Sequence, residues 1–478
     1  MRSIGLAVAV WLIAASGAAQ EERYELGRRL KRMELAWEAA DGPARAAAVE
    51  PLEAAVRSFF AFRQRTAAQR LDDAWYAVRG RVPTPLERWA VAQRCDFSPR
   101  LVEASKNRWR LRVTPFYDVE RPAEVQVRLA WTLKSREPQD AAPRVWGGGE
   151  ASWEELERGY DWPAPAQAVG DFRWEWQFVA GDERYEWGDI GASRVERLTE
   201  RLDAVRAFAR QPAATATATG RDSIAQLLPL LDDLAAGKTL ETDYPADRLL
   251  RLLEALVAAD GDSRKVLAEW ARTGDVWATL SSDSGVVPVR MRAPAARDQD
   301  SKPLGVLVLL HGAGGSENMF FDTYGAGRAV QLGLERRYLV VAPRQGLFGL
   351  GLGLDPLLDV LASHFEIDRR NVVLLGHSMG AAQLTRQAAR HPKSVRAAIA
   401  LGGGGTASDS EDARRVPWFI AAGARDFGRP GASALAKRLE STGARTVYKE
   451  YPDVEHLAIV QASLDDAFRW LDQLGKAD

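Results

Sequence analysis

The sequence predicts a C-terminal α/β domain with a mostly parallel sheet and flanking helices, preceded by an accessory region of helices and antiparallel strands. Three patterns carry this prediction. Apolar strands alternate with helices from about residue 275, strands with alternating polarity lie between about 105 and 190, and helical periodicity runs from Glu21 to about Ala77. A chain of 478 residues is also too long for one ordinary domain.

The composition is that of a globular protein, with 46% apolar and 27% charged residues. The formal net charge is -1, from 64 basic and 65 acidic residues. Such a balance gives no reason to expect a nucleic-acid partner or an anionic membrane surface. Cys95 is the only cysteine, so the chain forms no internal disulfide, and we expect a buried thiol there.

Residues 1–19 have the pattern of a signal peptide. Arg2 precedes an apolar run from Ile4 to Ala15, and small residues then suit cleavage before Gln20. The alternative is an uncleaved membrane anchor, for which the apolar run is short. We expect a secreted or periplasmic protein without a membrane span after cleavage.

The accessory region, residues 20–210, contains a tryptophan-rich β subdomain at about 105–190. In its segment 171–180, Phe172, Trp174, Trp176 and Phe178 alternate with other residues and so share one face of a strand. That face is either a platform for stacking sugar rings, which would give a polysaccharide contact, or the core of a small sheet; the second is favoured. Residues 211–273 are predicted as a linker, 211–220, followed by a helical connector.

Residues 274–478 form the predicted catalytic domain. Its strands alternate with helices, which indicates a parallel sheet that is covered on both faces. Ligands bind such sheets at the carboxyl ends of the strands, and the chemically informative residues all lie at such ends.

The central motif is Gly376-His377-Ser378-Met379-Gly380, which follows an apolar strand and opens a helix. A strand that turns sharply into a helix crowds any side chain beside the nucleophile, which explains both glycines. The helix N-terminus also favours negative charge that develops at the serine. In this setting the pentapeptide predicts that Ser378 is a nucleophile.

A serine nucleophile needs a base on a loop after the last strand. His456 fits, because a strand ends near Tyr451 and a helix begins after the histidine. The other four histidines are poorly placed. His311 ends a different strand, His364 lies in a helix, His377 is expected to point away across the turn, and His391 sits in a helix-to-strand turn.

The acid should follow the preceding strand. Asp426 lies just beyond a strand that ends near Gly423, where its carboxylate would hold the histidine in the tautomer that accepts the serine proton. Asp453 and Glu455 are alternatives, but they are one and three residues from His456 and cannot easily reach its Nδ1.

A tetrahedral intermediate needs two donors for its oxyanion. The backbone N–H of Met379 is one candidate, and the N–H of Ala313, between glycines of the segment 311–315, is the other. Serine, acid and histidine thus occur in one workable order, with the oxyanion loop upstream.

These residues also carry a family resemblance. Residues from about 275 to 478 resemble the α/β-hydrolase superfamily, and most of all its secreted esterases, which include polyhydroxybutyrate-depolymerase-like and feruloyl-esterase-like enzymes and dienelactone-hydrolase relatives. The matching stretches are VLVLLHGAGGSEN, LVVAPRQG, FEIDRRNVVLLGHSMGAA, IAAGARDF and YPDVEH. The sequence departs from the family at Ala381, where a glycine is common, and in the unusually apolar segment 346–355.

In that apolar segment, Leu347 and Phe348, with Leu350 and Leu352, either line an acyl pocket or pack under the following helix. No cofactor is expected. Residues 235–239 resemble the end of a phosphate loop but follow a helix and lack its first glycine, and no histidine pair has the spacing of zinc ligands.

The sequence therefore predicts a secreted serine carboxylic-ester hydrolase that acts through an acyl-enzyme on a small-molecule or polymer ester. Two alternatives stay open. One is a serine peptidase of the same fold, and the other is a non-catalytic polysaccharide-binding protein with a vestigial hydrolase domain.

Overall fold

A computed structural model describes most of the chain, and the description below concerns these residues. They are 17–106, 108–122, 126–136, 143–163, 165, 168–211, 216–295, 302–346, 351–408 and 410–474, without the side chains of 186 and 187. The signal peptide predicted for residues 1–19 lies almost wholly outside them.

The C-terminal domain is built on an eight-stranded sheet in the order β16-β15-β14-β13-β11-β12-β10-β9. The strand β10 is antiparallel to both neighbours, and the strands from β11 to β16 are parallel. The α/β-hydrolase sheet predicted from the sequence is thereby confirmed. The strands are β9 (Val276–Ser282), β10 (Gly285–Arg292), β11 (Leu304–Leu310), β12 (Tyr338–Pro343), β13 (Ile367–His377), β14 (Val395–Leu401), β15 (Trp418–Gly423) and β16 (Thr446–Tyr451).

Helices cover both faces of this sheet, which explains why its central strands are buried on both sides. One face packs against α13, α14 and α16, and the other against α12 and α17. The helical segments of the domain are α11 (Met319–Asp322), η2 (Tyr324–Gly327), α12 (Arg328–Glu335), α13 (Leu354–His364), α14 (Met379–Arg390), α15 (Glu411–Arg414), α16 (Arg429–Ser441) and α17 (Ala458–Leu474).

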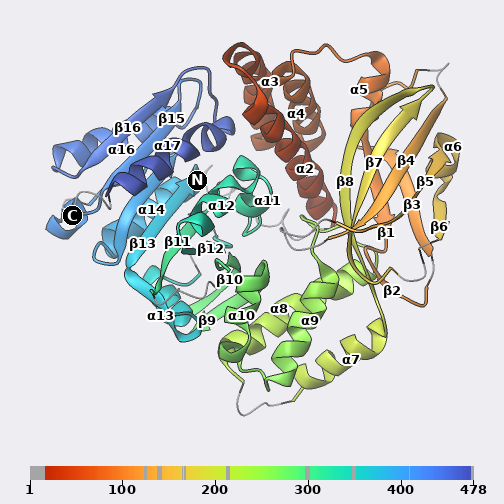
Figure 1. The fold of residues 1–478 in the computed structure, drawn as a ribbon. Coiled ribbons are helices and arrows are strands. Elements are labelled where there is room, and N and C mark those ends of the chain that lie inside the picture. Colours follow the sequence, from red (N-terminus) through yellow and green to blue (C-terminus); the bar gives the residue numbers. More distant parts are fainter. Residues whose placement is uncertain are drawn as a thin grey trace.

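The N-terminal helices are α2 (Gly17–Ala39), α3 (Gly42–Phe60), α4 (Gln64–Val78) and α5 (Pro85–Ala92). The break between α2 and α3 falls at the expected place, where the Asp41 carboxylate accepts the Ala44 N–H and Pro43 occupies the first turn of α3. In Figure 1, α2, α3 and α4 stand between the large sheet and the antiparallel sheets. Their apolar residues share one core with α12 and α17, so these helices are packed onto the catalytic domain.

The accessory β region consists of two antiparallel layers and one short parallel pairing. A five-stranded sheet has the order β2-β8-β7-β4-β5, and a three-stranded sheet has the order β1-β3-β6. The strands are β1 (Gln93–Ser98), β2 (Leu101–Glu103), β3 (Arg108–Pro115), β4 (Val127–Ser135), β5 (Val145–Ser152), β6 (Tyr160–Pro163), β7 (Gly170–Ala180) and β8 (Glu183–Val195), with α6 (Trp153–Arg158) after β5.

The aromatic face of β7 is the core of this region. Phe172, Trp174, Trp176 and Phe178 are each at most 2% exposed, and the Trp174 ring packs against Trp109 and Trp162 of the smaller sheet. Rings buried in this way cannot stack on a sugar, so the interpretation as a sheet core is confirmed. The polysaccharide contact expected as the alternative has no platform in these four side chains.

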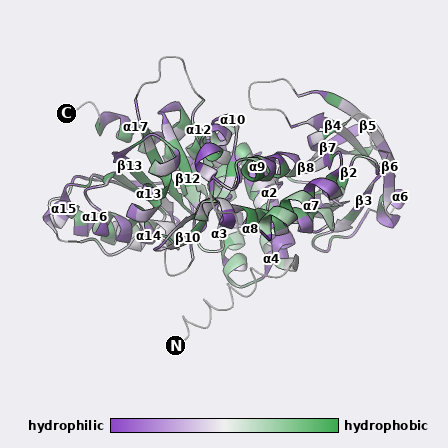
Figure 2. Ribbon diagram, turned by 90° about the horizontal axis from the view of Figure 1, so that it is seen from below, coloured by the Kyte–Doolittle hydropathy of each residue, from purple (hydrophilic) through white to green (hydrophobic). Residues whose placement is uncertain are grey.

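The segment 211–273 differs from the linker and connector predicted for it. After α7 (Leu198–Ala209), α8 (Ala218–Ala235) begins inside the expected linker and is capped by Thr217. The helices α8 and α9 (Ala246–Ala258), followed by η1 (Ser263–Lys265) and α10 (Leu267–Thr273), bury their leucines in the core of β9 and β10. Figure 2 shows hydrophobic residues on α8 and α9 between the two sheet regions. The segment is part of the domain core, because a leucine-rich helix face needs a partner.

Candidate active site

Ser378 lies at a sharp turn between β13 and α14. Its backbone has φ 56° and ψ −116°, a strained conformation for a residue with a side chain. The glycines on both sides of Ser378 are required. A Cβ atom on Gly376 would lie 2.4 Å from the Gly380 carbonyl oxygen, and a Cβ atom on Gly380 would lie 2.0 Å from the Leu310 carbonyl oxygen. The strain exposes the serine hydroxyl at the carboxyl end of the sheet.

The structure brings Ser378, His456 and Asp426 into one hydrogen-bonded row. His456 Nε2 lies 2.9 Å from Ser378 Oγ, and His456 Nδ1 lies 2.7 Å from Asp426 Oδ1. Asp426 follows β15 and His456 follows β16, as the sequence predicted. The row has the geometry in which a histidine accepts the proton of a serine.

The carboxylate of Asp426 is fixed by two donors on the same oxygen. Besides His456, the Gly428 N–H donates to Oδ1 at 2.6 Å. Burial alone would raise the pKa of Asp426, but the hydrogen bond and the charge of His456 outweigh burial and hold that pKa below its usual value. The ionised carboxylate accepts the Nδ1–H, which leaves Nε2 free to accept the serine proton.

The two alternative acids lie elsewhere. Asp453 is exposed, and the Glu455 carboxylate is buried and accepts the backbone N–H groups of Leu457 and Ala458. Glu455 therefore caps the start of α17 and does not reach Nδ1 of His456. The geometry supports Asp426 over both.

The two predicted oxyanion donors flank Ser378. Met379 follows it in the first turn of α14, and Ala313 lies in the loop that passes beside it. A Cβ atom on Gly312 would lie 3.3 Å from the Ser378 Cβ atom, so this loop is close to the nucleophile. Neither the Met379 nor the Ala313 N–H donates a hydrogen bond to another described residue, which leaves both for an oxyanion.

His377 contributes more than the sequence suggested. Instead of pointing away, its ring lies against those of Tyr324 and His456, and its Nε2–H donates to the His456 carbonyl oxygen at 2.8 Å. Burial, together with the charge of His456, lowers the pKa of His377 to about 3, so its ring is neutral. Its position next to the nucleophile was the only sequence signal for this contact, which helps to fix the backbone of His456.

A second support comes from the N-terminal helix α2. The Glu34 carboxylate of α2 accepts the Ala326 N–H at 3.1 Å, in a segment where Gly325 and Ala326 both have left-handed φ values. The neighbouring Tyr324 reaches the oxyanion loop, because a Cβ atom on Gly312 would lie 2.9 Å from its hydroxyl oxygen. The helix α2 therefore braces the loop that carries Ala313.

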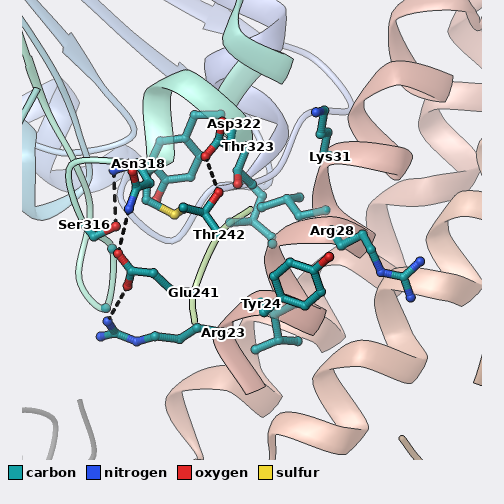
Figure 3. A pocket seen from close by; sticks show the side chains of 18 of the residues that line it. Arg23, Tyr24, Arg28, Lys31, Glu241, Thr242, Ser316, Asn318, Asp322 and Thr323 are labelled. Carbon is teal, nitrogen blue, oxygen red and sulfur yellow. Dashed lines mark hydrogen bonds and ion pairs between the residues drawn. The ribbon is translucent and has the colours of Figure 1, made fainter. Parts of the chain in front are cut away.

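The structure does not describe the two residues predicted to bind substrate. Leu347 and Phe348 lie outside the described residues, and Leu352, from the same segment, is buried in the core with α13. The cleft at Ser378 has a volume of about 210 Å³ and is walled by the oxyanion loop and by α2, α3 and α4 (Figure 3). Sequence reasoning did not connect the N-terminal helices with the site.

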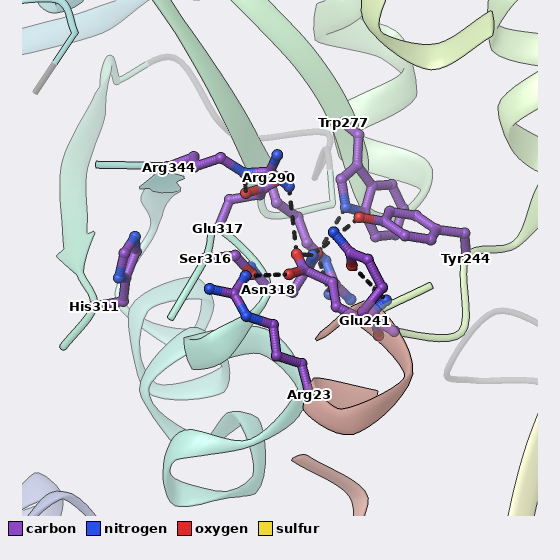
Figure 4. A network of polar contacts seen from close by, with 12 residues as sticks. Arg23, Glu241, Tyr244, Trp277, Arg290, His311, Ser316, Glu317, Asn318 and Arg344 are labelled. Atoms are coloured by element: carbon purple, nitrogen blue, oxygen red, sulfur yellow. Dashed lines mark hydrogen bonds and ion pairs between the residues drawn. The ribbon is translucent and has the colours of Figure 1, made fainter. Parts of the chain in front are cut away.

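A polar network anchors the oxyanion loop on the far side of the cleft (Figure 4). The buried Glu241 carboxylate accepts from Asn318 at 2.8 Å and pairs with Arg23 of α2 at 3.2 Å and with Arg344 at 3.3 Å. Arg344 also pairs with Glu317. Burial would raise the pKa of Glu241, but the two arginines and the hydrogen bonds lower it.

The Arg290 guanidinium of β10 extends this network, and its replacement tests how much the network stabilises the fold. Its side chain is 3% exposed and pairs with Asp275 and Asp322, each at 2.6 Å. We expect Arg290→Met to lower the free energy of unfolding by about 3 kcal/mol, because Asp322 loses its arginine partner and Asp275 keeps only Arg292, which is 3.6 Å away. Chemical denaturation measures this change. Arg370→Met, which removes a 92% exposed guanidinium, is the control and should change stability by less than about 1 kcal/mol; equal effects would contradict the role of Arg290.

Glu455 gives a pH-dependent prediction. Burial raises its pKa to about 7 from an ordinary value of 4.5, so between these pH values the folded chain keeps a proton that the unfolded chain has lost. Stability should therefore fall as pH rises through this window, by on the order of 3 kcal/mol. In Glu455→Gln this loss disappears. Chemical denaturation at pH 4.5 and pH 8 measures the free energy of unfolding of both proteins. Relative to the wild type, the variant should be more stable at pH 8 than at pH 4.5. A stability difference that is the same at both pH values would refute the assignment.

Two further properties of the described chain bear on the class of protein. No group of three or more His, Cys, Asp and Glu residues in the described part has an arrangement that would hold a metal ion. No helix in the same residues is long and apolar enough to cross a membrane.

The fold and the site define a class. The C-terminal domain is an α/β hydrolase, and residues 307–477 match the model of a family described as the alpha/beta hydrolase family. With a serine at its strand-to-helix turn, the domain is that of a serine hydrolase.

Several solved structures are similar to 41–42% of this chain. One is an S-formylglutathione hydrolase from Staphylococcus aureus, which is 15% identical with a TM-score of 0.35, over 41% of this chain and 98% of that chain. Another is a ferulic acid esterase, which is 18% identical with a TM-score of 0.35, over 42% of this chain and 98% of that chain. A feruloyl esterase module from Clostridium thermocellum, complexed with sinapinate, is 16% identical with a TM-score of 0.34, over 41% of this chain and 87% of that chain. No curated protein matches the chain.

Proposed function

We propose that this protein hydrolyses carboxylic esters through an acyl-enzyme on Ser378. The observation that carries the proposal is the row of hydrogen bonds from Ser378 through His456 to Asp426, beside the N–H groups of Met379 in α14 and Ala313 in the oxyanion loop, which donate to no other described residue. The proposed catalytic residues are Ser378, His456 and Asp426, with Met379 and Ala313 as oxyanion donors.

The mechanism follows from this geometry. Ser378 Oγ attacks the ester carbonyl carbon while His456 Nε2 takes the hydroxyl proton, and the carbonyl oxygen becomes an oxyanion facing the Met379 and Ala313 N–H groups. The C–O bond to the alcohol then breaks, and His456 returns its proton to the leaving oxygen. Water attacks the acyl-enzyme by the same steps in reverse, which releases the acid and restores the serine.

The charges in the cleft support an ester over a peptide substrate. A peptidase that removes residues from the amino end of a chain needs a carboxylate that is free to pair with the peptide amine. Each carboxylate that lines this cleft already has an arginine partner, namely Glu241 with Arg23, Asp243 with Arg100, Asp189 with Arg173 and Asp322 with Arg290.

A substrate panel tests the proposal. The full chain should hydrolyse 4-nitrophenyl esters and should leave 4-nitroanilides of single amino acids and short peptides essentially uncut. Anilide cleavage at a comparable rate would favour the peptidase, and loss of both reactions in folded protein would favour the vestigial hydrolase.

We further propose that the protein is exported, with cleavage before Gln20. The support is the sequence pattern of residues 1–19. Cleavage there would keep the contact in which the Gln20 side chain accepts the Glu241 N–H at 3.1 Å, and so would keep α2 anchored. N-terminal sequencing of protein from the native host tests this, and a chain that begins at Met1 would contradict it.

A further inference from the structure

The helices α2, α3 and α4 supply a set of apolar side chains to the cleft that leads to Ser378, next to the basic Arg23, Arg28 and Lys31 of α2. These apolar side chains, which we call the wall, recur at helical spacing and so share one face of each helix; they are Leu26, Leu30, Ala55, Val56, Phe59 and Leu71. None belongs to the catalytic domain, so a substrate bound there touches two regions of the chain at once.

The wall is fixed to the catalytic residues at two points. The Phe59 ring lies over the oxyanion loop, because a Cβ atom on Gly314 would be 2.7 Å from it. The Phe60 ring packs edge-on against Phe427 at 5.9 Å, and the Phe427 ring lies 3.9 Å from that of His456. The ion pair between Glu53 and Arg425, 2.9 Å, holds the same end of α3.

These contacts indicate which side of a bound ester, the alcohol or the acyl group, lies in the cleft. The leaving oxygen must face His456 Nε2 to receive its proton, and the Phe427 ring next to His456, which does not line the cleft, is 59% exposed, so this side opens to solvent. The oxyanion loop and Phe59 both line the cleft. An ester placed for attack thus points its alcohol toward solvent and its acyl group into the cleft.

We propose that α2, α3 and α4 form the acyl-binding site, and that the substrates are esters of apolar carboxylic acids larger than acetic acid. This inference rests on the proposed function. The cleft, at about 210 Å³, is smaller than the roughly 300 to 1,000 Å³ of sites for drug-sized ligands, so it fits an acyl group of moderate size. Each methylene that enters it should raise kcat/KM about fourfold until the cleft is full.

Gly27 of α2 offers a test, because it lines the cleft without filling it. A Cβ atom there would meet only Thr323 Oγ1, at 3.5 Å, which is ordinary contact distance. In Gly27→Leu the rest of the side chain would occupy space meant for the acyl group, while the helix should gain stability from losing a glycine. Gly27→Ala gives a smaller, graded blockage. Ala39→Leu places the same side chain on the same helix at an exposed position and is the matched control.

The experiment compares 4-nitrophenyl acetate, butyrate, hexanoate and octanoate, with melting temperatures to verify folding. In the wild type kcat/KM should rise along this series. Gly27→Leu should lower kcat/KM at least tenfold for the longer esters and less than twofold for the acetate, with Gly27→Ala between the two and Ala39→Leu like the wild type.

Two results would overturn the inference. One is an unchanged chain-length profile in folded Gly27→Leu, and the other is an equal effect of Ala39→Leu. A parallel series of acetate esters with longer alcohols identifies the side of the ester, because a Gly27→Leu effect confined to that series would place the alcohol in the cleft and refute the acyl assignment. Failure of the proposed function is distinct, since it would show as a wild type that does not hydrolyse even the acetate.

Discussion

Replacement of Ser378 by alanine is expected to lower ester turnover by on the order of 10³-fold or more. The only oxygen positioned to attack the carbonyl is lost, since Oγ lies 2.9 Å from the base His456. The fold should persist, because the change removes one hydroxyl and leaves no cavity of consequence. Steady-state kinetics with a 4-nitrophenyl ester measures the loss.

The control for this variant is its stability. Alanine also has to adopt the strained φ of 56°, so the melting temperature should be compared with that of the wild type. Near wild-type turnover in a folded Ser378→Ala protein would remove the proposed mechanism as a whole.

Asp426→Asn is expected to lower turnover by about 10²- to 10⁴-fold with little change in folding. The amide can turn its NH₂ toward Nδ1 of His456, which then carries its proton on Nε2 and no longer accepts one from Ser378. Kinetics at saturating and limiting ester measure the effect, which should lie in kcat more than in KM.

The other two carboxylates near the histidine supply the comparison. Asp453→Asn and Glu455→Gln should change turnover far less, since Asp453 is exposed and Glu455 caps α17 through Leu457 and Ala458. A larger loss in Asp453→Asn than in Asp426→Asn would show that Asp426 is the wrong acid.

Local patterns were enough to predict the catalytic domain. Strands such as Leu304–Leu310 are buried on both faces, so their apolar runs are visible in sequence, and the turn at Ser378 has steric needs that glycines reveal. The proposed acid and base could be predicted because each follows a parallel strand, and such strands end at the same edge of the sheet.

The walls of the site could not be predicted in this way. The contact between Glu34 and Ala326 joins residues 292 positions apart, and no sequence pattern near either residue predicts the other. The same holds for Phe59 over Gly314, since an apolar helix face looks alike whether it lines a cleft or fills a core.

The expected linker illustrates a related limit. The small, uncharged residues near 211–220 are typical of a linker, yet Thr217 caps α8. Gly220 packs so closely against Gly261 that a Cβ atom on it would lie 2.1 Å from the Gly261 carbonyl oxygen. Small residues serve close packing as well as flexibility, and only the partner segment distinguishes the two.

The most direct test of the central claim is the mass of the protein after reaction with a fluorophosphonate, followed by mapping of the modified peptide. We predict that the wild type gains one phosphonyl group, that the group is on Ser378, and that Ser378→Ala and heat-unfolded wild type gain none. An unmodified wild type that is folded, or a phosphonyl group carried mainly by another residue, would contradict the account.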